Sequence, residues 1–454
     1  MTDLHDLLIR YDKPGPRYTS YPTAPVWSDQ FTAQDYDDRL RSAGQSSEPM
    51  SLYAHIPYCD ALCYFCGCST VITQRHEKEA PYVDRLLSEA ALVRQTIGNS
   101  RTVIQHHWGG GTPTFLSPAM IEKLFTGLCE LFPLTNDAEV SIEIDPRVTT
   151  REQLEVLAKI GFNRISMGVQ DFDPKVQETV NRVQTFEQTQ ASVTAARELG
   201  FESVNLDLIY GLPYQTKAGI QRTLDLVHEL SPDRIACYGY AHVPWIRKHQ
   251  KVIPENALPR GAEKLELYLV TLDDMVAHDY TAIGMDHFAK NDDELALATE
   301  NGCLHRNFMG YSTHPAEDMV AFGMSAISEV GGAFSHNHKN LKEWEAAIDA
   351  GNLPVNRGMV RSVDDNLRRR IILDLMCHFR LLFDRHGGAE DFHRRYESEL
   401  RNLEPMVSDG LVTIGPDGIS VTPRGRLFVR NICMPFDAYL DRDAEKGPRY
   451  SRTI

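Results

Sequence analysis

The sequence predicts an α/β protein whose centre is an incomplete parallel (βα)6 barrel, three quarters of a TIM-like barrel. Two observations carry this prediction. Between about residues 50 and 240, short apolar runs alternate with amphipathic segments, as in repeated βα units. Residues suited to chemistry recur just after these runs, which is where a parallel barrel keeps its active site. About six units would leave the barrel open on one side.

The expected strands and helices alternate along this stretch. The strands are the apolar runs at residues 51–56, 102–108, 139–144, 164–169, 203–209 and 234–240. Amphipathic segments between them are the expected helices, for example Glu79–Ile97 and Pro118–Leu131. Ser117 before Pro118 has the form of a helix N-cap followed by proline at the first helical position.

Two further segments flank the barrel, which we expect to span residues 51–330. Residues 1–50 lack clear periodicity and include the aromatic stretch YTSYPT at 18–23, which predicts an N-terminal arm or lid. Residues 331–454 predict a mostly helical C-terminal domain, with helices at 364–380 and 388–403. Short alternating runs at 410–414 and 418–422, around the turn sequence GPDG, predict a small hairpin there.

Length and composition describe an ordinary globular protein. The 454 residues, 42% hydrophobic and 24% charged, can bury a large core. The net charge of −16 argues against a nucleic-acid partner, and an anionic substrate would need a local basic pocket. The first residues are acidic where a secretory signal is basic, and no run approaches the roughly 20 apolar residues of a membrane span. We therefore expect a soluble, cytoplasmic protein without a membrane partner.

Four of the nine cysteines, Cys59, Cys63, Cys66 and Cys68, follow the first expected strand. Thiolates bind iron–sulfur clusters and structural zinc. Structural zinc usually takes a second ligand pair elsewhere in the chain, and no second C-x2-C or histidine pair of that kind occurs here. Zinc and a redox dithiol therefore fit less well than an iron–sulfur cluster.

The pattern C-x3-C-x2-C, with aromatic Phe65 before its last cysteine, resembles the signature of radical S-adenosylmethionine (SAM) enzymes. The resemblance implies a [4Fe–4S] cluster held by Cys59, Cys63 and Cys66, with a fourth iron open to chelate SAM. One electron from the cluster would then cleave the sulfonium and release a 5′-deoxyadenosyl radical. The cofactor carries this chemistry, while the protein orients it and excludes water and oxygen.

Ten segments narrow the resemblance to the oxygen-independent coproporphyrinogen III oxidases. They are YAHIPYC (53–59), CGC (66–68), WGGGTPT (108–114), SIEIDP (141–146), SMGVQD (166–171), NR (181–182), NLDLIYGLP (205–213), IGMDHF (283–288), HRNFMGY (305–311) and GMSAIS (323–328). Taken alone, the glycine triplet at 109–111 could be only a turn, and Glu143 only an exposed carboxylate at a strand end.

The resemblance implies two bound SAM molecules. The first, on the cluster, would be contacted by Tyr53, Phe65, Gly110, Glu143 and Ile327. The second would be held by Gly111, Thr112, Gln170, Arg182, Asp207 and Ala241. The Asp207 carboxylate suits ribose hydroxyls or an ammonium group, and the Arg182 guanidinium suits the methionine carboxylate. Cys68 and Tyr53 are the expected catalytic residues.

The implied reaction turns the propionates on rings A and B of coproporphyrinogen III into vinyl groups, giving protoporphyrinogen IX and carbon dioxide. It needs an electron donor and an acceptor, both unidentified, and we expect a monomer. The substrate carries four carboxylates, for which the candidate partners are His242, Arg247, Lys248, His287, Lys290 and Arg306.

Two alternatives share the cluster motif. Heme chaperones of the same fold keep three cluster cysteines but lack Cys68 and the N-terminal arm, both of which occur here. Another radical SAM enzyme acting on a tetrapyrrole, such as a heme-degrading methyltransferase, is disfavoured by the same arm.

Overall fold

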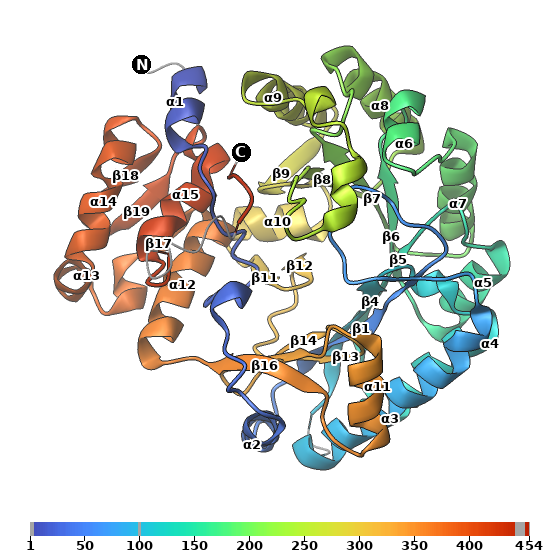
Figure 1. The fold of residues 1–454 in the computed structure, drawn as a ribbon. Coiled ribbons are helices and arrows are strands. Elements are labelled where there is room, and N and C mark those ends of the chain that lie inside the picture. Colours follow the sequence, from blue (N-terminus) through green and yellow to red (C-terminus); the bar gives the residue numbers. More distant parts are fainter. Residues whose placement is uncertain (1–3, 99–100, 441–449, 454) are drawn as a thin grey trace.

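The computed structural model describes residues 4–98, 101–440 and 450–453. Within these residues, one 12-stranded sheet has the order β16-β15-β14-β13-β1-β4-β5-β6-β7-β8-β10-β9 (Figure 1). The six predicted strands are all present, and they are parallel neighbours in chain order. They are β1 (Met50–Ile56), β4 (Val103–Gly110), β5 (Leu134–Ile144), β6 (Arg164–Gln170), β7 (Ser203–Tyr210) and β8 (Arg234–Gly239).

Helices that connect these strands lie along the outer side of the sheet (Figure 1). They are α3 (Glu79–Ile97), α4 (Pro118–Leu131), α5 (Arg151–Ile160), α6 (Pro174–Thr179), α7 (Phe186–Glu198) and α8 (Lys217–Leu230). Helices α5 and α7 each begin with a capping box, formed by Thr150 with Gln153 and by Thr185 with Gln188. The bounds of α3 and α4 match the prediction, but the Ser117 hydroxyl donates to Glu79 Oε1 at 2.7 Å instead of capping α4.

The sheet extends beyond the predicted strands on both sides. Next to β1 lie the parallel β13 (Met319–Phe322) and then antiparallel β14 (Ile327–Val330), β15 (Ala333–Asn337) and β16 (Val355–Val360). Antiparallel β10 (His287–Lys290) and β9 (Tyr280–Gly284) follow β8, with α9 (Ala262–Ala277) before them and α10 (Glu294–Asn301) after. The predicted domain boundary at residue 330 falls inside this sheet. There Gly331 and Gly332, both with positive φ, turn β14 directly into β15.

The C-terminal part is a second core built mostly of helices. Its helices are α12 (Val363–His378), α13 (Ala389–Arg395), α14 (Glu397–Ser408) and α15 (Val429–Cys433). The predicted hairpin is present as β18 (Val412–Ile414) and β19 (Gly418–Val421), and β17 (Arg380–Leu382) adds a strand that the sequence did not predict. Residues 441–449 and 454 of the predicted C-terminal domain lie outside the described residues.

The predicted arm contributes to both cores. Helix α1 (Leu4–Tyr11) packs into the C-terminal core, together with buried Tyr18 and Tyr21. Helix α2 (Ala33–Ala43) packs instead against the core of the large sheet. An isolated bridge also pairs Pro14 with Arg452. None of the described helices has both the length and the apolar character needed to cross a bilayer.

Arg101 ties several of these elements together. Its side chain is almost fully buried, forms an ion pair with Asp318 and donates to the carbonyl oxygens of Glu48, Ala43 and Pro49. Asp318 also accepts from the backbone N–H of Gly331, at the turn between β14 and β15. Arg101 therefore links the end of α2 and the start of β1 to the start of β13.

We expect Arg101→Lys to destabilise the fold, since an ammonium group cannot reach all four acceptors at once. Losing charge-assisted bonds at a buried site should cost about 2–3 kcal/mol of unfolding free energy. Urea unfolding followed by circular dichroism measures this. Arg41→Lys is the control, because the Arg41 side chain is 65% exposed in its ion pair with Asp37 and should change stability by less than about 0.5 kcal/mol. Equal stability of both variants would contradict the assigned role.

Candidate active site

The four clustered cysteines lie on a loop that follows β1 and includes the two short strands β2 (Tyr58–Cys59) and β3 (Val71–Ile72). Cys63 is buried, Cys59 and Cys66 are half-buried, and Cys68 is exposed. The loop is anchored by backbone bonds from Tyr64 to Val180 and from Thr73 to Cys59. The thiols therefore sit at the carboxyl end of β1, as predicted.

Hydrogen-bond donors surround the three expected ligand sulfurs. Thr112 Oγ1 donates to Cys59 Sγ at 3.4 Å, and Arg147 and Arg182 each approach Cys63 Sγ to 3.7 Å. The backbone N–H of Cys68 donates to Cys66 Sγ at 3.4 Å. The Cys68 thiol also hydrogen-bonds Cys66, which lowers the pKa of Cys66 to about 6. Donors of this kind stabilise thiolates and the anionic clusters that thiolates bind.

The chemistry of the donor set fits an iron–sulfur cluster. Cys59, Cys63 and Cys66 offer three soft thiolate donors on one loop, the kind of ligand that such clusters take. Among the described residues, only His228, Asp274 and His278 bring three ligand atoms within 4.8 Å of one another, and that group lies outside the cysteine loop.

Arg147 is a residue of the site that sequence reasoning did not identify. It pairs with Asp145 at 2.6 Å, and Asp145 also accepts from Arg182 at 3.1 Å. Burial opposes ionisation of Asp145, but the charges and hydrogen bonds of the two arginines still hold its pKa below the usual value. Arg182 also donates to the carbonyl of Gly168 and to Gln184. Most of its guanidinium is therefore already engaged beside Cys63.

Glu143 lies among groups that keep it ionised. It accepts from the backbone N–H of Gly110 at 3.1 Å, and its other oxygen lies 3.5 Å from His107 Nε2. Burial opposes ionisation, but the hydrogen bond and charge of His107 hold the pKa of Glu143 below its usual value. The His107 ring stacks on Tyr53, with centroids 5.9 Å apart. The structure thus brings Tyr53, Gly110 and Glu143 together through His107, a residue that sequence reasoning missed.

Asp207 lies on β7, facing the neighbouring strand β6. Ser166 Oγ donates to it at 3.2 Å and Asn205 Nδ2 at 2.8 Å. Burial, reinforced by the charge of Glu143, raises the pKa of Asp207 to about 7. Gln170 ends β6 with φ 70° at a bulge in the β6–β7 pairing. Gln170 therefore lies at the carboxyl-end rim of the sheet, and Asp207 lies in the carboxyl-terminal half of β7.

The remaining predicted cofactor residues lie around the same rim. Gly111 has no room for a side chain, because a Cβ would lie 2.6 Å from the Pro57 carbonyl oxygen. Ile327 begins β14, beside the carboxyl end of β13. Phe65 and Ala241 are joined by Gln250, whose side-chain amide donates to both of their carbonyl oxygens.

Two of the predicted substrate-binding cations already have protein partners, one at the cysteine loop and one on the opposite rim. Arg247 donates to the Gly67 carbonyl, and His249 bonds the Cys66 carbonyl at 2.8 Å, so this segment holds the cysteine loop. Lys290 donates to the Ser231 carbonyl and pairs with Asp233 at the amino end of β8, on the opposite rim. Because β10 runs antiparallel to β8, its last residue points away from the site.

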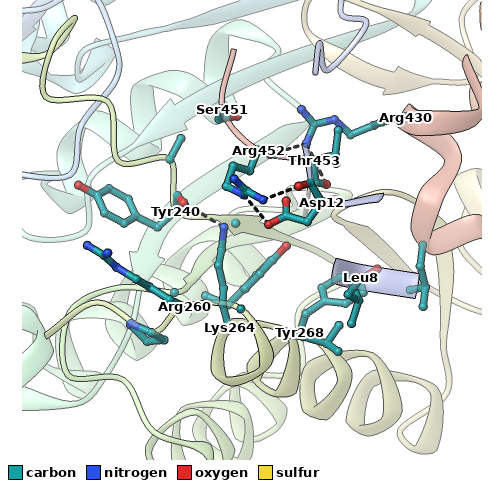
Figure 2. A pocket seen from close by; sticks show the side chains of 18 of the residues that line it. Leu8, Asp12, Tyr240, Arg260, Lys264, Tyr268, Arg430, Ser451, Arg452 and Thr453 are labelled. Atoms are coloured by element: carbon teal, nitrogen blue, oxygen red, sulfur yellow. Dashed lines mark hydrogen bonds and ion pairs between the residues drawn. The ribbon is translucent and has the colours of Figure 1, made fainter. Parts of the chain in front are cut away.

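A cavity of about 750 Å³ opens beyond the ends of β7 and β8. Its wall combines α1, the segment after β8, α9 and residues 450–453 (Figure 2). Ala241 and His242 line it, and so do Arg17, Lys264 and Arg430. The cavity is large enough for a drug-sized organic ligand.

These features define a radical SAM protein: a parallel sheet with a three-thiol loop after its first strand and carboxylates on β5 and β7. Residues 53–227 match the radical SAM superfamily, whose members use a [4Fe–4S] cluster and SAM. Full-length relatives narrow the class. The oxygen-independent coproporphyrinogen III oxidases of Pseudomonas aeruginosa and Synechocystis sp. are 44% and 43% identical over 99% of this chain, covering 98% and 97% of their own lengths.

The solved structure of coproporphyrinogen III oxidase (HemN) from Escherichia coli, a radical SAM enzyme, aligns with a TM-score of 0.91. It is 44% identical and covers 97% of this chain and 99% of its own. This chain belongs to the family of oxygen-independent coproporphyrinogen III oxidases.

Proposed function

We propose that this chain converts the ring A and ring B propionates of coproporphyrinogen III into vinyl groups, giving protoporphyrinogen IX in heme biosynthesis. The observation that carries the proposal is the three-thiol loop at the carboxyl end of β1 in a chain with full-length relatives of that name. Each propionate would lose one hydrogen atom, one electron and carbon dioxide. An electron donor and an acceptor, both unidentified, complete the balance.

Cys59, Cys63 and Cys66 would hold the cluster, and SAM would bind beside it. Together these cofactors supply one-electron cleavage of SAM and abstraction of hydrogen from the substrate. Glu143, oriented by His107 and the Gly110 N–H, offers an ionised acceptor for an ammonium group. Tyr53, Phe65 and Ile327 would complete the first SAM site. Cys68 would act on the substrate side, since it is exposed.

A second SAM would bind at Gly111, Thr112, Gln170, Arg182, Asp207 and Ala241. Support comes from Asp207, a half-buried carboxylate whose partners are a hydroxyl and an amide, so that it has capacity for another donor. Arg182 would have to share its guanidinium with Asp145.

The same proposal includes the shape and setting of the chain. The six parallel strands would curve into a partial barrel, with residues 1–50 as an arm and residues 331–454 adding the helical C-terminal part. We propose a monomer in the cytoplasm, where thiols stay reduced. The cysteines that the structure describes are all unpaired, which supports a reducing compartment.

Anaerobic reconstitution with iron and sulfide tests the function. We expect the reconstituted protein, given coproporphyrinogen III, SAM, a strong reductant and an added one-electron acceptor, to form protoporphyrinogen IX, detected by chromatography after oxidation to the porphyrin. Omitting SAM is the matched control and should leave the substrate intact. If the protein cleaves SAM without making divinyl product, and instead transfers heme to an acceptor, the chaperone alternative would be favoured.

A further inference from the structure

Arg306 is a buried cation with hydrogen-bonding capacity to spare. It lies on β11 (His305–Asn307), is only 7% exposed, and stands over the Tyr311 ring, 4.7 Å from its centroid. Its Nη2 donates to the Arg17 carbonyl oxygen at 3.3 Å. Among the described residues, Nε and Nη1 have no hydrogen-bond partner, and no carboxylate lies within ion-pair distance of Arg306. Two of its nitrogens can therefore serve an incoming acceptor.

The surroundings of Arg306 are positive in an otherwise acidic protein. Arg17 lies next to it, stands over the Tyr238 ring and forms an ion pair with Asp286. His287 is packed against Tyr238 and Tyr311, with ring centroids 5.7 and 5.3 Å away, and its Nδ1 has no partner among the described residues. Burial, followed by the charges of Arg306 and Arg17, lowers the pKa of His287 to about 3, so its ring is neutral. Two cations thus face one carboxylate.

Other buried arginines nearby have their charge or their donors satisfied. Arg430 donates to the carbonyl oxygens of Gly15, Pro16, Arg452 and Thr453, so it holds the two ends of the chain together. Arg234 pairs with Asp293 and Glu294. Burying an arginine without a counter-ion is costly. The arrangement around Arg306 is therefore not explained by a structural role.

Arg306 is connected to the 750 Å³ cavity through Arg17. The Arg17 carbonyl oxygen accepts from Arg306, and Arg17 stands over the ring of Tyr238 on β8. Arg17 and Asp286 also line the 750 Å³ cavity that reaches Ala241. A ligand in that cavity can therefore approach Arg17, beside Arg306, and Ala241 together.

We propose that Arg306, with Arg17 and His287 beside it, binds a carboxylate of the tetrapyrrole substrate; the inference rests on the proposed function. The planar guanidinium keeps N–H groups on Nε and Nη1 that no described residue uses, and such donors form charge-assisted hydrogen bonds with a carboxylate. Ion pairing stabilises a carboxylate and so opposes its loss as carbon dioxide. The bound group is therefore one of the two propionates that the product retains, and Arg306 is a positioning residue that presents the opposite rings for reaction.

Binding of coproporphyrin III, the stable oxidised form of the substrate, tests this without turnover. Fluorescence quenching by the reconstituted protein in the absence of SAM gives the affinity. We expect Arg306→Gln to weaken binding by about tenfold or more, and Arg306→Lys to recover part of it. Arg260→Gln is the control, because Arg260 lines the 750 Å³ cavity as Arg17 does but is 68% exposed and paired with Glu255. Its affinity should stay within about twofold of the wild type.

Two further measurements identify the partner of Arg306. Coproporphyrin III tetramethyl ester, which has no free carboxylate, should bind wild type and Arg306→Gln equally. Equilibrium dialysis of labelled SAM should give the same affinity for both proteins. The melting temperature of Arg306→Gln should not fall, since the substitution removes a buried charge that lacks a counter-ion.

The inference is overturned if Arg306→Gln binds the free acid as tightly as wild type does, or if wild type does not bind it. Weakened binding of SAM with unchanged porphyrin affinity would instead assign Arg306 to a cofactor carboxylate. A lower melting temperature with loss of ester binding would make it a structural residue. Wild type that binds coproporphyrin III yet forms no divinyl product would contradict the proposed function and leave the binding result intact.

Discussion

Replacing Cys63 with serine is expected to abolish the iron–sulfur absorption and all SAM cleavage. Cys63 is the most buried of the three candidate ligands, and it faces the guanidinium groups of both Arg147 and Arg182. A serine hydroxyl is a poor substitute for a soft thiolate on iron. The variant should therefore lose turnover completely. Iron and sulfide analysis with visible absorption spectra, followed by a SAM-cleavage assay, measures both effects.

Cys68→Ser should behave differently. Only Gly67 separates Cys68 from Cys66, and Cys68 is exposed where Cys63 is buried. We expect this variant to keep the cluster and lose turnover of coproporphyrinogen III. Cys303→Ser is the control, because Cys303 is an exposed cysteine outside the loop, and it should match the wild type. A Cys63→Ser protein with a full complement of iron and normal SAM cleavage would disprove the assignment of Cys63 as a cluster ligand. Iron loss in Cys68→Ser would disprove the assignment of Cys68 to a role outside the cluster.

Replacing Asp207 with asparagine should reduce the number of SAM molecules bound per chain from two to one. The variant should form almost no divinyl product but still cleave some SAM. The ionised carboxylate would accept charge-assisted hydrogen bonds, which are worth about 1.5–3 kcal/mol, or roughly tenfold or more in affinity. Anaerobic equilibrium dialysis with labelled SAM gives the stoichiometry. The control is Asp225→Asn, on the outer helix α8, and this variant should bind two SAM molecules per chain. Wild type that binds one SAM and still forms product would rule out the second site.

The pKa of Asp207 adds a test by pH. Burial raises this pKa to about 7, so the charged form grows as pH rises from 6 to 8. Second-site affinity should increase over that range in the wild type and stay flat in Asp207→Asn. In the absence of SAM, the stability of the fold changes with pH in the opposite direction to the second-site affinity. The unfolded carboxyl ionises first, so the wild type loses stability as pH rises from about 4 to 7 and the asparagine variant gains relative to it.

The sequence predicts the six parallel strands because each is a short apolar run with a distinctive residue at its carboxyl end. The cysteine loop, the rim position of Gln170 and the position of Asp207 in the carboxyl-terminal half of β7 followed from that pattern. Arg147 and His107 did not, because a cation or a histidine near a strand looks the same in sequence whether it faces a sulfur, a carboxylate or water. Their roles depend on side-chain directions that only the fold supplies.

The extent of the sheet was harder to predict. The strands after residue 318 are short, and they join the barrel sheet through β13, whose partner β1 lies far away in the chain. Local pattern therefore gave no reason to add them to that sheet. The Gly331-Gly332 pair was a usable signal for a tight hairpin. Residues 1–50 predict an arm because the segment as a whole lacks clear periodicity, yet its helices α1 and α2 are amphipathic, and each contributes to a core.

The pairing of β1 with β13 has a consequence for how the protein is made. Ser51 is aligned with Met319, so one edge of β1 stays unpaired until most of the chain has left the ribosome. Contacts this distant in sequence form slowly, and an open strand edge invites aggregation meanwhile. The cysteine loop follows that strand directly. We therefore expect metal loading to come after synthesis, on a chain whose sheet is already complete.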